Sequence, residues 1–321
     1  MLSALVRYLG NYRLGIIIIK ELKPYGYSKY AKRYYHNKMF GEGVELPEKD
    51  EPKRPPYKCG SFNSKFKKAE KTVEYFNRSR TSLDSILNLF EEHKDKEAQI
   101  SYLLETYKDI REKYSMEVGN KKNYPLIVLE GLDGSGKSTL SKQLAKNLGA
   151  EWISTPPKSL ISIRDKFDDP FHWRSPFYYF CNYVAAIDVT KALKTKPVVM
   201  DRFWHSTTAY ALAQMKENYY DVMKSTELPE KGSDVYEWPT DLLKPDIIIY
   251  LDVSENMRIQ RLSRRASKTD QENLLEAKQE FRKNVVQAYE NMANPGIFKV
   301  NGDPSFKNVL ENVTAKVKEL F

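Results

Sequence analysis

The sequence has few of the residues that build disulfide frameworks, zinc sites or membrane spans. Its 321 residues include two cysteines, Cys59 and Cys181, which lie far apart and form no metal-binding pattern. The four histidines show no zinc-binding spacing. The longest apolar run, Leu14 to Ile19, is far shorter than the roughly 20 residues of a membrane-spanning helix. We therefore expect no transmembrane segment and no disulfide scaffold, and the cysteine usage suits a reducing compartment.

Positive charge is concentrated in the first part of the chain. Lys and Arg outnumber Asp and Glu by 25 to 17 in residues 1–124, but only by 27 to 26 in residues 125–321. A basic segment of this kind is a solvated helical surface, a site for an anionic partner, or a targeting segment. The first 20 residues contain Arg7, Arg13 and Lys20 and no acid, which is compatible with a mitochondrial presequence. We expect a mitochondrial location, with a cytoplasmic one as the alternative.

The composition divides the chain into three parts. Residues 1–60 are basic and then rich in Pro, Gly and charge, which predicts a loosely ordered or targeting segment. Residues 61–123 carry apolar side chains at helical spacing, for example Leu83, Ile86 and Phe90, with a cap at Thr81 or Ser82. They predict a helical extension whose apolar stripes are core or docking faces. A polar break at residues 118–125 separates it from a third part, residues 124–321.

Strands and helices alternate after this break. The strand candidates have continuously apolar centres, as is typical of parallel strands covered on both faces; they are Leu126–Glu130, Glu151–Ser154, Pro197–Asp201, Asp246–Asp252 and Ile297–Val300. Helical patterns fill the gaps between them. The alternation predicts an α/β domain of three layers around a parallel five-stranded sheet, with ligands at the carboxyl ends of the strands.

A glycine-rich turn follows the first of these strands. The segment GLDGSGKS fits the phosphate-binding pattern G-x-x-x-x-G-K-[ST], with a strand before it and a helix after it. In such a loop the backbone amides surround the phosphates at the positive end of the helix, the lysine reaches the β- and γ-phosphates, and the serine hydroxyl binds Mg²⁺. The hydroxyl of the next residue, Thr139, could add a hydrogen bond to the α-phosphate. The predicted ATP-binding residues are Gly131, Leu132, Asp133, Gly134, Ser135, Gly136, Lys137, Ser138 and Thr139.

Further charged residues indicate which acceptor receives the phosphoryl group. No guanine-reading N-K-x-D pattern is present, which argues against a GTPase. Asp201 and Arg202 follow a buried strand directly, where the acid can hold Mg²⁺ and the arginine can bind a phosphate; the plain alternative is a strand-end ion pair. Four arginines lie near a helix end and form either a solvated basic face or a lid over a transferring phosphoryl group; they are Arg258, Arg261, Arg264 and Arg265.

Four segments together resemble the thymidylate kinase family: LEGLDGSGKST, DRFWHSTTAYA, LKPDIIIYLDVS and the arginine-rich segment followed by FRKNVVQAYENMA. The resemblance covers about residues 124–321, and it implies a P-loop fold of the nucleoside monophosphate kinase type. It also implies transfer of the γ-phosphoryl group of ATP, with Mg²⁺, to a nucleoside monophosphate. Within the family the chain looks like the mitochondrial UMP-CMP kinase branch, on segments such as VYEWPTDLLKPD and MANPG.

The resemblance also implies roles for single residues. Asp133 matches the acid that bonds the 3′-hydroxyl of the acceptor sugar, and Tyr179 matches the aromatic side chain that stacks on the base. Arg202 matches the residue that holds the acceptor phosphate, while Asp201, with Ser138, supports Mg²⁺. Lys137, Asp201, Arg202, Arg261, Arg264 and Arg265 are the catalytic candidates.

Two departures from the family pattern affect the acceptor. Tyr183 stands where thymidylate kinases carry an arginine that reads the thymine carbonyl. A tyrosine hydroxyl can donate or accept a hydrogen bond, so it could serve uracil and cytosine alike, unless Tyr183 simply packs inside its helix. The family's phosphate-binding arginine after the second strand is also missing, and Lys158 or Arg164 are the candidates to replace it.

The prediction is an ATP-dependent kinase for pyrimidine nucleoside monophosphates, either UMP and CMP or their deoxy forms. One alternative is a thymidylate kinase that converts dTMP to dTDP. The other is a non-catalytic interaction protein whose P-loop domain senses nucleotides. The expected partners are ATP, a pyrimidine nucleoside monophosphate and, by likeness to relatives, a second copy of the chain; we expect no nucleic acid.

Overall fold

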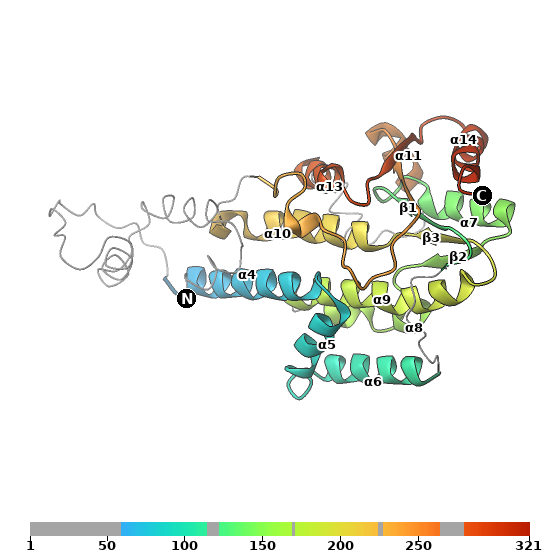
Figure 1. Ribbon diagram of the computed structural model, residues 1–321. Helices are drawn as coiled ribbons and strands as arrows, with labels where there is room; N and C mark the ends of the chain where they lie inside the picture. Colours follow the sequence, from blue (N-terminus) through green and yellow to red (C-terminus); the bar gives the residue numbers. More distant parts are fainter. Residues whose placement is uncertain (1–58, 114–121, 169–170, 224–226, 264–278) are drawn as a thin grey trace. The chain divides into compact units, whose positions relative to one another are not determined.

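A computed structural model describes residues 59–113, 122–168, 171–223, 227–263 and 279–321 (Figure 1). The chain divides into two compact units, one of Met1–Glu70 with Tyr219–Thr226 and the other of Lys71–Asn218 with Glu227–Phe321. The sheet and the described site residues belong to the second unit. The predicted lid residues Arg264 and Arg265 lie outside the described residues. The predicted targeting segment also lies outside them.

The second unit is built on a parallel sheet of five strands. These are β1 (Leu126–Glu130), β2 (Glu151–Ser154), β3 (Val198–Asp201), β4 (Ile247–Asp252) and β5 (Phe298–Asn301), in the order β2-β3-β1-β4-β5. Every predicted strand is present, within one residue at either end. Asp201 is in register with Leu129 of β1 and with Ser154 of β2. The carboxyl ends of these three strands therefore share one edge, where ligands bind in folds of this class.

Helices connect the strands and cover them. They are α7 (Lys137–Leu148), α8 (Lys158–Ile161), α9 (Arg174–Ala192), α10 (Trp204–Met223), α11 (Glu255–Ser263), α13 (Gln279–Asn291) and α14 (Phe306–Lys318). Short 3₁₀ helices lie at Arg164–Phe167, Phe171–Trp173 and Asp234–Tyr236, labelled η2, η3 and η4.

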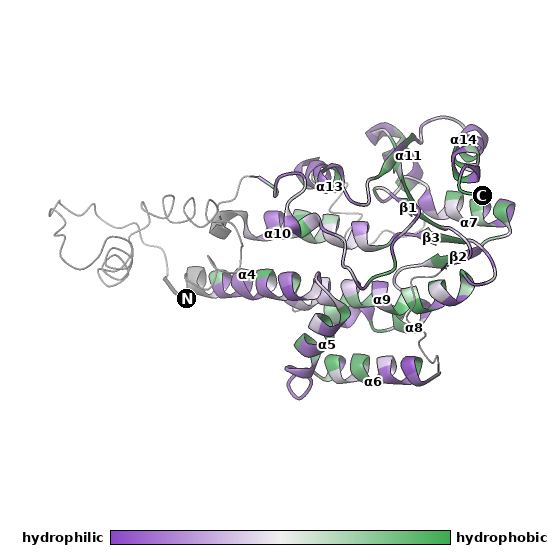
Figure 2. Ribbon diagram, viewed as in Figure 1, coloured by the Kyte–Doolittle hydropathy of each residue, from purple (hydrophilic) through white to green (hydrophobic). Residues whose placement is uncertain are grey.

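One face of the sheet packs against α7 and α14. Ile127 and Leu129 of β1 point to this face and belong to one buried cluster with Leu140 and Leu144 of α7 and with Val313 of α14. The strands carry the hydrophobic colour in Figure 2 where this core lies. Because side chains alternate along a strand, Glu130 points to the opposite face.

The opposite face is covered by α9, α10 and α13. The ring of Tyr250 on β4 lies 4.9 Å from that of Tyr289 on α13, and Glu130 bonds to the first turn of α10. The arrangement is helix, sheet, helix, so the predicted three-layer α/β fold is confirmed. Burial on both faces explains why β1 and β3 are apolar throughout except at their last residues.

Helices also form in the predicted N-terminal extension: α4 (Cys59–Ser79), α5 (Leu83–Glu91) and α6 (Ala98–Lys113). Ser82 caps α5, since its hydroxyl accepts the Ser85 amide at 3.1 Å, as one of the two predicted caps. The ring of Phe180 on α9 lies 5.4 Å from Phe90 of α5 and 5.4 Å from Tyr107 of α6. These helices therefore pack on α9; a separate domain at residues 61–123 stays a prediction.

None of the described helices combines the length and apolarity of a membrane span.

Candidate active site

The phosphate loop joins β1 to α7 at the shared edge of the sheet. Gly131 and Gly134 adopt φ values of 141° and 84°, which side chains other than hydrogen disfavour. A Cβ atom on Gly134 would lie 2.7 Å from Leu262, and one on Gly131 would lie 2.8 Å from the Leu251 carbonyl oxygen. Both positions therefore require glycine, for conformation and for space, which gives the predicted pattern its physical reason.

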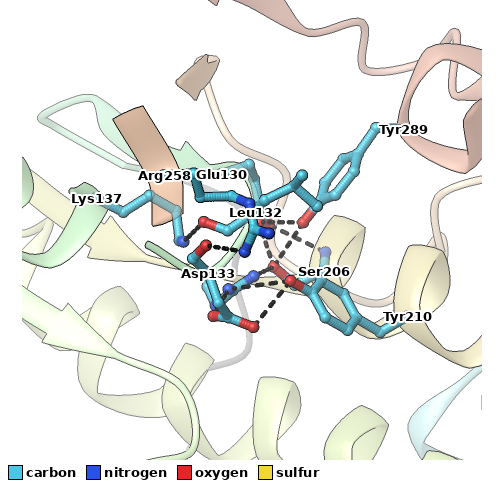
Figure 3. A network of polar contacts seen from close by, with 9 residues as sticks. Glu130, Leu132, Asp133, Lys137, Ser206, Tyr210, Arg258 and Tyr289 are labelled. Atoms are coloured by element: carbon cyan, nitrogen blue, oxygen red, sulfur yellow. Dashed lines mark hydrogen bonds and ion pairs between the residues drawn. The ribbon is translucent and has the colours of Figure 1, made fainter. Parts of the chain in front are cut away.

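Lys137 begins α7 and its ammonium crosses the loop. Its Nζ donates to the Leu132 carbonyl oxygen at 2.7 Å, and the side chain is buried (Figure 3). Burial, followed by the nearby charge of Arg202, lowers the pKa of Lys137 to about 8. The ammonium is thus held against the loop backbone. An anionic ligand bound beside it would raise the pKa of Lys137 again and favour the charged form.

Two cavities open at this edge of the sheet and share part of their walls. The nucleotide cavity, as we call the one at the phosphate loop, is lined by Asp133, Gly134, Gly136, Lys137, Ser138, Lys142, Trp152, Ser154, Thr155, Asp201 and Arg202. The acceptor cavity is lined by Asp133, Thr155, Arg174, Ser175, Tyr178, Arg202, Ser206, Thr207, Tyr210, Ala211 and Gln214. Asp133, Thr155 and Arg202 line both. Lys137 and Arg202 therefore both face the nucleotide cavity, and the two cavities adjoin at the three shared residues.

Asp133 and Arg202 form an ion pair between the two cavities. Nη2 of Arg202 donates to Asp133 Oδ1, and the Tyr210 hydroxyl donates to Asp133 Oδ2 at 3.0 Å. Burial alone would raise the pKa of Asp133, but the charges of Arg202 and Lys137 outweigh it and keep that pKa below its usual value. The pKa of Arg202 is raised by Asp133 despite burial, so the guanidinium stays a cation.

The backbone of Arg202 is unusual. Its φ of 68° lies in the left-handed region, which costs a non-glycine residue on the order of 1 kcal/mol. Its amide donates to the Leu129 carbonyl oxygen at 3.0 Å, and its own carbonyl oxygen accepts the Thr155 hydroxyl at 3.2 Å. Contacts to both neighbouring strands therefore hold the arginine in this conformation, and such strain is common where a side chain has a functional position.

The predicted magnesium ligands, Ser138 and Asp201, line the nucleotide cavity together. Among the described residues, no group of three or more His, Cys, Asp or Glu side chains is placed to hold a metal ion. Mg²⁺ commonly binds through one or two protein oxygens, substrate phosphates and water rather than in a cage of protein ligands. One hydroxyl and one carboxylate beside a phosphate loop therefore fit a magnesium ion that arrives with a nucleotide.

The arginines of α11 brace the phosphate loop. Arg258 is fully buried, pairs with Glu255 at 2.9 Å and donates to the Asp133 carbonyl oxygen at 3.3 Å. Arg261 donates to the Ser135 carbonyl oxygen at 2.6 Å and to that of Gly302 at 2.8 Å. Neither lines the nucleotide cavity or the acceptor cavity, and a catalytic role for Arg261 stays a prediction.

The structure corrects the prediction for the base-stacking residue. Tyr179 is 1% exposed, its hydroxyl bonds to Thr208 at 2.8 Å, and its ring lies 6.0 Å from that of Phe76 on α4. Its neighbour Tyr178 lines the acceptor cavity instead. Successive residues on a helix are about 100° apart, so a register error of one residue turns a side chain from the cleft into the core.

Tyr183 also faces away from the cleft. Its hydroxyl donates to Asp241 Oδ1 at 2.6 Å, while the other oxygen of Asp241 accepts the backbone amide of Leu83 at 2.8 Å. Tyr183 does not line the acceptor cavity and joins α9 to α5 through this carboxylate. The structure therefore favours the plain alternative, in which Tyr183 packs between helices, and a base-reading role for Tyr183 stays a prediction.

Several residues of the acceptor cavity went unpredicted. Arg174 is ion-paired with Asp168 and lies 5.4 Å from the Tyr178 ring, four residues further along α9. It is the cation that α9 adds to this wall, whereas Lys158 and Arg164 line neither cavity. Thr207, Tyr210 and Gln214 come from α10. A helical spacing of three to four residues on both helices was the signal that could have found them.

Comparisons with known proteins show which family the chain belongs to. The family model of thymidylate kinase matches residues 129–313, from the end of β1 into α14. "UMP-CMP kinase 2, mitochondrial" of Homo sapiens is 38% identical over 203 residues, which are 63% of this chain and 44% of that protein. This chain thus spans less than half the length of that relative. A "Probable thymidylate kinase" of Methanococcus vannielii is 28% identical over 60% of this chain and 89% of that protein.

Solved structures were compared as well. A thymidylate kinase from Candida albicans is 19% identical, with a TM-score of 0.46 over 62% of this chain and 93% of that one. A deoxyadenosine kinase from M. mycoides is 20% identical, with a TM-score of 0.43 over 61% of this chain and 100% of that one. The family assignment depends on the sequence match alone, which extends over residues 129–313 of 321, more than half of the chain. The chain belongs to the thymidylate kinase family.

Proposed function

We propose that this protein is a kinase that transfers the γ-phosphoryl group of ATP to a pyrimidine nucleoside monophosphate, UMP or CMP or their deoxy forms. The observation that carries the proposal is the pair of cavities that share Asp133, Thr155 and Arg202. Two nucleotides bound with their phosphates at this shared wall would meet end to end. Family membership supports the same reaction.

The donor side of the reaction depends on the phosphate loop. The loop amides and the positive end of α7 bind the phosphates of ATP, and Lys137 leaves the Leu132 carbonyl to contact the β- and γ-phosphates. Ser138 and Asp201 would hold Mg²⁺, which would supply positive charge against the charge of the transferring group. In this reaction class positioning and charge neutralisation supply most of the rate, and no covalent enzyme intermediate is needed.

The acceptor side depends on Arg202 and on the wall formed by α9 and α10. Arg202 binds the acceptor phosphate and brings its oxygen into line with the γ-phosphorus. Asp133 and Tyr210, already bonded to each other, lie where a sugar hydroxyl would approach. The exposed part of the Tyr178 ring offers a stacking surface for the base, and Arg174 adds a second cation to this wall.

A pyrimidine acceptor is supported by the polar groups on α10. The Thr207 hydroxyl and the Gln214 amide line the cavity, and each can both donate and accept a hydrogen bond. Such groups suit uracil, which presents a carbonyl at C4, and cytosine, which presents an amine there. The name of the human relative points the same way. Because Tyr183 does not line this cavity, these side chains take the base-reading role in the proposal.

Thymidylate kinase is the second candidate. The matching family model and the archaeal relatives carry that name. Arg174 is the observation in its favour, because a guanidinium in the acceptor cavity could donate to a base carbonyl as easily as to a phosphate.

A substrate panel tests both candidates. Purified full-length protein is given ATP, Mg²⁺ and dTMP, dUMP, UMP, dCMP or CMP in turn, and the diphosphate formed is quantified. The proposal expects the highest kcat/KM with a uracil or cytosine nucleotide; a strong preference for dTMP would establish the second candidate. ATP binding without any diphosphate product would instead support the non-catalytic, nucleotide-sensing alternative.

We also propose a mitochondrial location, supported by the acid-free basic segment at residues 1–20 and by the name of the human relative. A reporter protein fused behind residues 1–60 should enter mitochondria, and neutral substitutions at Arg7, Arg13 and Lys20 should abolish import. A cytosolic reporter would favour the cytoplasmic alternative. A homodimer stays a prediction.

A further inference from the structure

Glu130 is a buried carboxylate that the proposed chemistry does not use. It is the last residue of β1, directly before the phosphate loop, and its side chain is 0% exposed. It lines neither cavity. Leaving a carboxylate in such a place costs folding free energy unless its oxygens are fully hydrogen-bonded, so its presence calls for a structural reason.

The two oxygens of Glu130 accept four hydrogen bonds. Oε1 accepts the backbone amides of Phe203 at 3.0 Å and of Ser206 at 3.2 Å. Oε2 accepts the hydroxyl of Ser206, in a short bond, and that of Tyr289 at 3.0 Å (Figure 3). Three separate elements, β1, α10 and α13, therefore converge on one side chain.

Two of these bonds cap helix α10. The helix starts at Trp204, so the amides of Phe203 and Ser206 lie at its amino end, where backbone donors have no partner within the helix. Phe203 has no side-chain oxygen that could serve as a cap. A negative carboxylate from β1 takes that place and also suits the positive end of the helix dipole.

The capped turn directly follows Arg202. The Arg202 amide bonds to Leu129 and the next amide, that of Phe203, bonds to Glu130, so two consecutive residues of β1 hold the backbone on both sides of the φ of 68°. The side chain is held by the same group, because the Ser206 hydroxyl accepts Arg202 Nη1 at 2.9 Å and donates to Glu130. Both the conformation and the direction of Arg202 thus depend on Glu130.

Helix α10 also carries one wall of the acceptor cavity, with Ser206, Thr207, Tyr210, Ala211 and Gln214. Since Glu130 adjoins the loop that binds the donor phosphates, this buried side chain links that loop to the start of α10, in addition to the bond between Tyr210 and Asp133. We infer that Glu130 is a positioning residue that holds Arg202 and the start of α10 against the phosphate loop, and so sets where the acceptor phosphate binds. This inference rests on the proposed function for the identity of the acceptor.

The main test is Glu130→Gln in the full chain. Glutamine keeps the shape and one oxygen for the two amides, but it removes the charge and puts a donor where two hydroxyls donate. We expect the KM for the best monophosphate of the panel to rise at least tenfold, while the KM for ATP changes less than twofold. Tyr289→Phe, which removes one hydroxyl donor and keeps the volume, should shift the same constant in the same direction, about threefold. It serves as the test if the first variant does not fold.

A double-mutant cycle separates positioning from general support. If Glu130 acts through Arg202, then Glu130→Gln added to Arg202→Ala should raise the acceptor KM no further than Arg202→Ala alone. If the increases in acceptor KM of the two single variants multiplied in the double variant, the inference would be overturned. So would an equal rise in both KM values, or a lower melting temperature with the acceptor KM unchanged.

Tyr236→Phe is the matched control. Its hydroxyl is also buried, but it bonds to the Pro229 carbonyl at 3.0 Å and to the Asn291 amide at 3.3 Å, not to the carboxylate. It should lower the melting temperature without changing either KM. If the wild-type protein forms no diphosphate, the proposed function fails, and calorimetric affinity for the monophosphate then decides the inference by the same comparisons.

Discussion

The two cavities of the cleft are built in different ways. The nucleotide cavity draws five of its lining residues from one short segment, Asp133 to Ser138, whose shape is dictated by glycine conformations and the start of one helix. The acceptor cavity draws most of its lining from α9 and α10, which lie apart in the chain, and the rest from Asp133, Thr155 and Arg202. The first is a property of a local segment, and the second is a property of the tertiary packing.

This difference governs how each cavity responds to change. Apart from the α11 arginines that brace the phosphate loop, a substitution outside the loop leaves the loop amides and the α7 dipole in place, so we expect donor binding to tolerate most distant changes. On the acceptor side, Arg202 depends on contacts from β1 and α10, and Tyr178 depends on how α9 lies on α4, α5 and α6. We therefore expect substitutions in the donor segment to be severe and local, and those in the acceptor wall to be graded.

Lys137→Ala should have the largest effect. It removes the cation nearest the predicted β- and γ-phosphates, and loss of one preorganised charge-stabilising group costs about 10²–10³ in kcat. The measurement is kcat with saturating ATP and acceptor. Lys146→Ala, on the same helix but exposed, is the control and should turn over at the wild-type rate. If Lys137→Ala kept more than a tenth of the wild-type kcat, the loop would not be the donor site.

Arg202→Ala should act on the acceptor. Losing a charge-assisted bond to a phosphate costs about 1.5–3 kcal/mol, which corresponds to roughly 10- to 100-fold in the KM for the monophosphate. The KM for ATP should change much less, because the loop and Lys137 remain. Initial rates with each substrate varied in turn give both constants. An unchanged acceptor KM would show that the ion pair with Asp133 is only structural.

The contrast between the cavities also explains what the sequence could predict. Strand ends, the phosphate loop and the Asp201–Arg202 pair follow from local patterns, because a five-residue apolar strand and a glycine turn have few alternative structures. Tyr178 could not be told from Tyr179, because α9 is apolar around most of its surface, with α4, α5 and α6 covering the side that would otherwise be polar. Arg258 and Arg261 brace the loop through Asp133 and Ser135, which lie more than a hundred residues earlier in the chain. No local sequence pattern indicates contacts over such a separation.

Tyr178→Ala should come next in size. Stacking of a base on an aromatic ring contributes about 1–3 kcal/mol, so the acceptor KM should rise roughly tenfold. Tyr179→Phe is the paired control: it loses only the bond to Thr208, which should lower the free energy of unfolding by about 1 kcal/mol and leave the KM unchanged. The reverse pattern, with Tyr179 affecting the KM and Tyr178 only stability, would restore the original assignment from the sequence.

The pH dependence of ATP binding should report the state of Lys137. Its pKa of about 8 in the free protein means that the ammonium is charged below pH 8 and loses its proton above it. Since only the charged form attracts phosphate, ATP affinity should fall as pH rises through 8, up to about tenfold between pH 7 and 9. Calorimetry over this range measures it. In Lys137→Ala the affinity should be weaker but flat across the same interval; a parallel decline there would assign the titration to another group.

Tyr183→Phe should have the smallest effect on substrate choice. The variant removes the bond to Asp241 Oδ1, which should lower the free energy of unfolding by about 0.5–1.5 kcal/mol, because Asp241 is exposed and water can replace the lost donor. The ratio of kcat/KM for UMP to that for CMP should stay as in the wild type, because the hydroxyl points toward Asp241 and not into the acceptor cavity.

Asp241→Asn should lower stability in the same way and also leave the ratio unchanged, since it weakens the same link between α9 and α5 from its other end. A shift in the ratio with Tyr183→Phe but not with Asp241→Asn would mean that the hydroxyl contacts the base after all; equal shifts in both would mean that base selection is transmitted through the packing of α9.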